Sequence, residues 1–127
     1  MPKLVRWEPD FSVRHEQMDA QHRDLLARCN QLAEHCQTDG DASADQRFDQ
    51  GFAQLREAAR AHFEAEATAL AQAGENDLEA HRFECEEFEY LVDEIVTTQN
   101  FDRLELQRFL ALWWVGHVTG MARNGRF

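Results

Sequence analysis

The stretch FDQGFAQLREAARAHFEAEATAL, residues 48–70, has apolar residues in steps of three and four along its whole length. This spacing is the period of one buried face of an α-helix. His62 and Glu66 are four residues apart and lie on that same face. The stretch therefore predicts a long amphipathic helix whose inward face carries an imidazole and a carboxylate. The complete face is Phe48, Phe52, Leu55, Ala59, His62, Glu66 and Leu70.

Three other segments, at about residues 18–36, 78–95 and 106–121, repeat this periodicity. Both prolines of the chain precede them, so no proline forces these helices to break. Four amphipathic helices joined by short connections most simply form an antiparallel bundle. We therefore expect an all-α fold, an up-down-up-down antiparallel four-helix bundle with an extended N-terminal arm. A single domain would span 1–127, with the arm at 1–17 and the bundle from about 18 to 123.

Polar residues and glycines predict where these helices begin and end. The stretch from Thr38 to Ser43 is typical of a loop, and Ser43 with Gln46 has the form of a capping box that starts the second helix. Gly74 is a typical stop for that helix. We expect the third helix to open near Asn76 or Asp77, and the fourth to follow Asn100 and Asp102.

Composition excludes several classes of protein. Hydrophobic residues make up 43% and charged residues 29% of the chain, which is typical of a folded soluble domain. The formal net charge of -11 argues against nucleic acid and against anionic membrane surfaces as partners. No apolar run is long enough for a transmembrane helix, and the N-terminus lacks the apolar stretch of a signal peptide. We expect a cytoplasmic protein.

The cysteines predict no disulfide framework. Cys29 and Cys36 lie seven residues apart on one predicted helix, which separates their Cα atoms by about 10 Å. That separation is beyond the reach of a disulfide. We interpret both as reduced core residues, and the third cysteine, Cys85, lies on the stripe of the third helix.

Each predicted helix carries one histidine on its apolar stripe. Burying four imidazoles without a shared partner would be costly, and a bound cation would offset that cost. Imidazole with carboxylate suits iron, zinc, copper or nickel better than calcium or magnesium. His15 in the arm is an alternative ligand, whereas His35 is expected on the solvated face. The predicted metal-binding histidines are His22, His62, His81 and His117.

Four segments of the chain resemble the hemerythrin-like proteins, in particular bacterial single-domain hemerythrins. The arm LVRWEPDFSVRHEQMDAQH resembles the opening segment of the family, and HFEAE resembles its second-helix motif. DLEAHRFECEEF and LALWWVGHV resemble the third and fourth motifs, in the same order. The resemblance implies a four-helix bundle, a non-haem di-iron centre of five histidines, one glutamate and one aspartate, and reversible dioxygen binding.

Carried over position by position, the resemblance implies two sets of iron ligands. His22 and His62 resemble the ligands of one iron, His81 and His117 resemble two of the three histidines of the other, and Glu66 resembles the bridging glutamate. Two positions depart from the family pattern. Cys85 stands where a second third-helix histidine is expected, and Ala122 stands where a bridging aspartate is expected.

These departures leave the metal and its number open. Without the second carboxylate bridge, two adjacent dications repel more strongly, so a di-iron centre should be weaker. The remaining ligands can be interpreted as two half-sites that share Glu66, each a two-histidine, one-carboxylate set typical of mononuclear non-haem iron. Zinc would also fit. Cys85 is either a thiolate ligand or a small core residue, and both interpretations stay open.

The first hypothesis for function is a hemerythrin-like metal-binding protein, with iron as the expected metal. It would bind dioxygen or another small diatomic ligand, or sense redox or metal state through its altered site. The second is a mononuclear or loosely coupled di-iron enzyme that reduces peroxide or nitric oxide. No general acid or substrate pocket is visible in the sequence, so we expect a binding protein rather than an enzyme. The third is a metal-free structural or interaction module.

Overall fold

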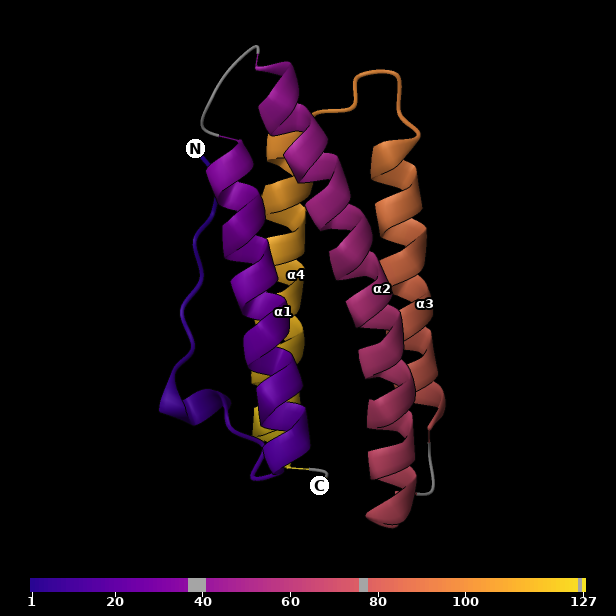
Figure 1. Cartoon of the computed structure of the whole chain (residues 1–127). Helices are drawn as coiled ribbons and strands as arrows, with labels where there is room; N and C mark the ends of the chain where they lie inside the picture. The colour runs from indigo at the N-terminus through magenta and orange to yellow at the C-terminus, as the bar shows by residue number, and fades with distance from the viewer. Residues whose placement is uncertain (37–40, 76–77, 126) are drawn as a thin grey trace.

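The computed structural model describes residues 1–36, 41–75, 78–125 and 127, and within these ranges it contains helices and no strand. Successive long helices run in opposite directions, so the chain passes up and down through the bundle four times (Figure 1). This confirms the predicted fold class. The elements are the 3-10 helix η1 (Pro9–Phe11) and the α-helices α1 (Glu16–His35), α2 (Ala42–Gln72), α3 (Glu79–Val96) and α4 (Arg103–Asn124).

The start of α2 differs from the predicted capping box. Asp41, not Ser43, caps this helix: its side chain accepts hydrogen bonds from the backbone N–H groups of Ser43 and Ala44, at 2.9 and 3.3 Å. A carboxylate at the first residue outside the helix satisfies free N–H groups and interacts favourably with the positive end of the helix dipole. Ser43 consequently lies inside the first turn, and its prediction as the cap is wrong.

The other predicted helix ends are partly testable. Gly74 has a φ of +89° and follows the last turn of α2, which confirms it as the stop. Asp102 caps α4 by accepting a hydrogen bond from the Leu104 N–H at 2.9 Å, as expected. Asn76 and Asp77, predicted to open the third helix, lie outside the described residues. In the described part, α3 begins at Glu79.

The buried apolar residues form two clusters with polar residues between them. The larger cluster includes Leu25, Ala59 and Trp114, and the smaller one includes Met18 and Leu70. His22 lies between these two clusters along α1, and the corresponding level of the other helices holds the buried residues His62, Glu66, His81 and His117. The bundle therefore has an internal polar layer, with apolar packing on both sides. None of the helices in the described ranges is long and apolar enough to cross a membrane.

The fourth helix buries most of its predicted apolar stripe, which is Leu106, Leu110, Trp113, His117 and Met121. The exception is Trp113, which is only half-buried, whereas its neighbour Trp114 is fully buried. The ring of Trp113 instead covers Phe88 on α3, with ring centroids 4.6 Å apart. Packing against both α1 and α3 gives α4 a wide apolar face, so two successive tryptophans can both contact the core.

The N-terminal arm runs alongside α1 (Figure 1). Two amide side chains, Asn30 and Gln107, hold it there. Gln107 on α4 is fully buried; its oxygen accepts from the Lys3 N–H at 2.7 Å, and its Nε2 donates to the carbonyls of Lys3 and Cys29, at 2.7 and 3.1 Å. Asn30 on α1 bonds the N–H and the carbonyl of Val5 in the same manner, at 2.9 and 2.8 Å. The two side-chain amides thus form with the extended arm the backbone hydrogen bonds that a neighbouring β-strand would otherwise form.

Replacing Gln107 with leucine should release this part of the arm. The change to an apolar side chain of similar size leaves part-buried backbone groups of Lys3 and the buried carbonyl of Cys29 without their partner, so we expect a loss of about 1–3 kcal/mol in the free energy of unfolding. Urea denaturation measures the loss, and limited proteolysis of the arm reports its release. Gln54→Leu, on the exposed surface of α2, is the matched control. Equal stability of the two variants would contradict the assigned role of Gln107.

Candidate metal centre

The carboxylate of Glu66 lies at the centre of the polar layer and is fully buried. Nε2 of His22 and of His62 lie 3.1 and 2.9 Å from its Oε2, and Nε2 of His81 lies 2.8 Å from Oε1. Nε2 of His117 is 3.1 Å from both oxygens. Each of the four long helices thus supplies one histidine that contacts this carboxylate, and α2 also supplies the carboxylate itself.

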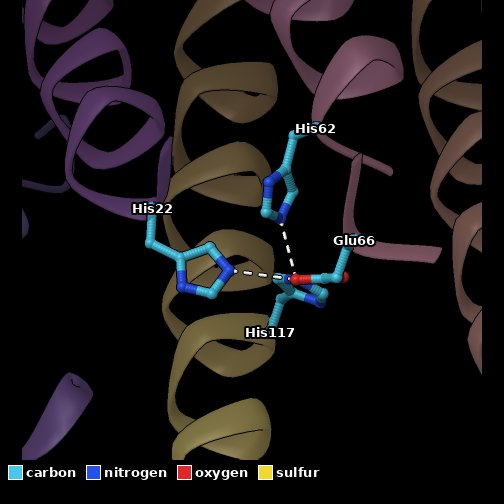
Figure 2. Close-up of side chains that lie close together, drawn as sticks. All are labelled: His22, His62, Glu66 and His117. Carbon is cyan, nitrogen blue, oxygen red and sulfur yellow. Dashed lines mark hydrogen bonds and ion pairs between the residues drawn. The ribbon is translucent and has the colours of Figure 1, made fainter. Parts of the chain in front are cut away.

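Four of these residues form one compact donor group. His22, His62, His117 and Glu66 are all buried, and each offers one ligand atom within 4.8 Å of the others. Figure 2 shows the rings of His22 and His62 pointing at the carboxylate of Glu66 from two sides, with His117 close behind it. Such a group could hold a metal ion.

The hydrogen bonds around this group are incomplete in a way that fits a cation. Nε2 of His62, which faces Glu66, has no hydrogen-bond partner among the described residues. Nδ1 of His22 also has none there, but it lies on the side of the ring away from Glu66, which Nε2 contacts. Nε2 of His62 is 2.9 Å from Glu66 without the alignment of a hydrogen bond. Buried polar atoms are nearly always paired. A nitrogen lone pair that faces a carboxylate without a hydrogen bond is an arrangement that a shared metal ion would satisfy.

Two further polar side chains hold the outer nitrogens of the histidines. Nδ1 of His62 lies 2.6 Å from the Gln21 side-chain oxygen, and Nδ1 of His117 lies 2.7 Å from Oε1 of Glu84. Acceptors at these positions favour a proton on Nδ1, which leaves the Nε2 lone pair free to face the centre. Sequence reasoning did not single out either contact. Gln21 neighbours His22 and Glu84 neighbours Cys85, so only the adjacency to site residues could have indicated them.

The electrostatics of the metal-free centre are set by burial and by these carboxylates. Burial opposes ionisation of Glu66, but contacts from four imidazoles hold the pKa of this carboxyl far below its usual range. Burial also opposes the charged form of His117, yet Glu66 and Glu84 raise its pKa to about 9. For His62, burial outweighs the contact with Glu66 and lowers the pKa. Without metal, the site therefore holds an anionic glutamate beside a cationic His117.

The metal-free protein should lose stability as pH rises from 6.5 to about 9. The pKa of His117 is raised from 6.5 to about 9, so its contribution is fully present below pH 6.5 and is lost as pH rises through 9. Urea unfolding across this range, in the presence of chelator, measures the slope. His117→Gln should flatten it. An unchanged slope in this variant would assign the pH dependence to another group.

His81 and Cys85 lie on the other side of Glu66. Sγ of Cys85 is 3.9 Å from Nδ1 and 3.8 Å from Nε2 of His81, and the cysteine is half-buried. Burial, followed by the negative charges of Glu66 and Glu84, raises the pKa of the thiol to about 12. The structure thus places His117 with His22 and His62, whereas the half-site interpretation pairs it with His81.

The remaining residues singled out in the sequence have packing or capping contacts. Nδ1 of His15 accepts a hydrogen bond from the Met18 N–H at 3.3 Å and caps α1, and its ring lies against Phe127. His35 is half-buried at the last turn of α1, rather than on a fully solvated face. Cys29 is fully buried and Cys36 is half-buried, both against the larger apolar cluster.

Comparison with known proteins agrees with this geometry. The hemerythrin HHE cation binding domain matches residues 13–123. The chain belongs to the hemerythrin family. The match covers most of the 127 residues, from the end of the arm through α4. Searches of curated proteins and of solved structures returned no match. The predicted family is confirmed, and a cation-binding domain is consistent with the buried histidine and glutamate group.

Proposed function

We propose that this hemerythrin-family protein binds one non-haem iron ion through His22, His62, His117 and Glu66, and that it binds dioxygen or another small diatomic ligand there. The observation that carries the proposal is the convergence of four buried ligand atoms, all within 4.8 Å of one another. Three helices supply these atoms, so the intact bundle, rather than one local motif, positions them.

Three imidazoles with one carboxylate suit iron, and zinc is the main competitor. Iron bound there would supply redox chemistry and an open position for a small ligand. The chain's own residues exclude water from the site, since His22 is fully buried and His62 and His117 are nearly so. Gln21 holds the ring of His62 and Glu84 holds the ring of His117, so that Nε2 of each ring is directed inward.

The structure supports one tightly held ion better than two. On the opposite side of Glu66, His81 has Cys85 as its neighbour, and the raised pKa of the thiol keeps it protonated in the metal-free protein. Ala122 offers no donor atom at the position where the family resemblance implies a bridging aspartate. A second dication there would have His81, a share of Glu66 and a thiol that must lose its proton to bind. We therefore propose that any second ion binds more weakly than the first.

Metal analysis of protein purified without added metal tests this function. We expect about one iron per chain and a visible absorption band that changes when oxygen is removed; a chelator should lower the melting temperature, since metal binding is coupled to folding. His62→Ala should lose the metal. His35→Ala, a histidine outside the group, is the matched control. Protein that contains zinc, or takes up no metal when iron is supplied, would contradict the proposal.

A further inference from the structure

A cavity of about 490 Å³ lies between α2 and α3 and reaches the histidine layer. Phe63 and Ala67 line it from α2, and His81 and Cys85 line it from α3, with Leu78 at the end. The volume is in the range of small-molecule sites. Phe63 forms the inner wall, because its ring centroid is 6.4 Å from that of His81 and 6.0 Å from that of His117.

The charged residues of this cavity are confined to its exposed rim. Glu64, Glu79 and Arg82 are all exposed, and Arg82 forms ion pairs with Glu79 and, at 3.9 Å, with Glu86. The rim therefore carries an excess of negative charge, which repels anions. The apolar interior beyond the rim disfavours any ion, since burial of an unpaired charge is costly. Small uncharged apolar molecules are the class that this cavity admits.

The small side chain at position 85 leaves space in the cavity beside His81. Cys85 is half-buried in the cavity wall, 3.8 Å from Nε2 of His81, which in turn lies 2.8 Å from Glu66. An imidazole in place of the thiol would extend several atoms farther into this space. A cysteine at position 85, where the family resemblance implies a histidine, thus leaves a larger space beside His81 and also replaces an imidazole ligand.

A second cavity, of about 300 Å³, opens between α1 and α2 beside His62. Gln21 lines it and lies 2.6 Å from Nδ1 of His62, on the outer side of the ring. A molecule that approached the centre from here would have to displace this contact. The cavity between α2 and α3 instead meets the centre at His81, which lines the cavity and whose Nε2 lies 2.8 Å from Glu66, with the ring of Phe63 beside it.

We propose that the cavity between α2 and α3 binds a small uncharged apolar molecule and is the route by which such a molecule reaches the centre from the His81 side. The binding part stands on the cavity itself, and the route part rests on the proposed function. The two parts can be tested separately, because Cys85 reports occupancy of the cavity without any metal.

Alkylation of Cys85 in the metal-free protein tests the binding part. N-ethylmaleimide, an uncharged reagent, should modify Cys85, and saturating benzene should slow this reaction on the order of tenfold. Site-resolved mass spectrometry follows each cysteine, and the half-buried Cys36 serves as an internal control whose rate benzene leaves unchanged. Acetate, a small anion, should give no protection. Equal rates at Cys85 with and without benzene would overturn the proposal.

Matched cavity-filling variants test the route. Ala67→Leu narrows the proposed cavity, and Ala61→Leu narrows the cavity beside His62. In iron-loaded, reduced protein, Ala67→Leu should slow nitric oxide association on the order of tenfold relative to the parent, and Ala61→Leu should leave it unchanged. The reverse order, or equal rates, would overturn the route. If iron does not load but benzene still protects Cys85, the proposed function fails while the binding site stands.

Discussion

Glu66→Gln should lose more than about 100-fold in metal affinity, since changes outside the ligand sphere already cost about 10–100-fold. The carboxylate of Glu66 contacts all of His22, His62 and His117. Glutamine keeps its size but removes the negative charge that balances the cation. Titration of the metal-free variant with iron under anaerobic conditions, followed by metal analysis after gel filtration, measures the loss.

The same change should destabilise the metal-free protein. Glu66 is the buried anion beside a cationic His117, and removing one partner of a buried ion pair costs roughly 3–5 kcal/mol. Because the pKa of Glu66 is lowered on folding, its contribution is present above about pH 4.5, the ordinary value, and is lost as pH falls further. Denaturation at neutral pH should show the full effect.

Glu64→Gln is the matched control for both measurements. Glu64 lies on the same helix, two residues earlier, and is exposed. It undergoes the same chemical change without contact to the histidines. Metal affinity that falls equally in the two variants would point to overall charge rather than to the site. Full metal affinity in Glu66→Gln would remove Glu66 from the proposed ligands.

The double variant Cys85→His, Ala122→Asp should raise the iron content from about one to about two ions per chain. The family resemblance places a histidine and a bridging aspartate at these positions. The new imidazole would stand beside His81, whose Nε2 already faces Glu66 at 2.8 Å. The new carboxylate would add a negative charge between two dications, which reduces their mutual repulsion. Metal analysis gives the stoichiometry, and the visible spectrum reports whether the two irons share a ligand.

Single variants separate the two contributions. Cys85→His alone should add ligand capacity but leave the dications poorly neutralised, so we expect only partial loading of the second position. Cys36→His with Ala122→Asp is the matched control, because Cys36 is also half-buried but its Sγ lies 3.9 Å from the Arg103 carbonyl, at the start of α4, rather than beside His81. A double variant that folds, as judged by circular dichroism, and still binds one iron would contradict the proposed alignment of Cys85 and Ala122 with the ligand positions.

The helices, and the height of the site along the bundle, were predictable because both depend on the spacing of residues within each helix. The three-and-four spacing of apolar residues records which face of each helix is buried, and His62 with Glu66 falls on that face within a single helix. The caps were less predictable, because two candidate side chains can lie within a few residues of each other. Asp41 and Ser43 both qualify as caps, and Asp41 is the cap because α2 begins at Ala42.

Sequence alone determined the all-α fold, the family and the histidines on the buried faces of the helices. Each of these follows from the order of residues along the chain, helix by helix. Tertiary packing determined which of those histidines share a point in space. The packing of α4 in the bundle brings His117 to His22 and His62, and it brings His117 to within 2.7 Å of Glu84 on α3. A periodic stripe specifies a face to within about a third of a turn. Contacts of 3 Å between helices depend on finer rotations and on packing of neighbouring side chains, which no single helix encodes.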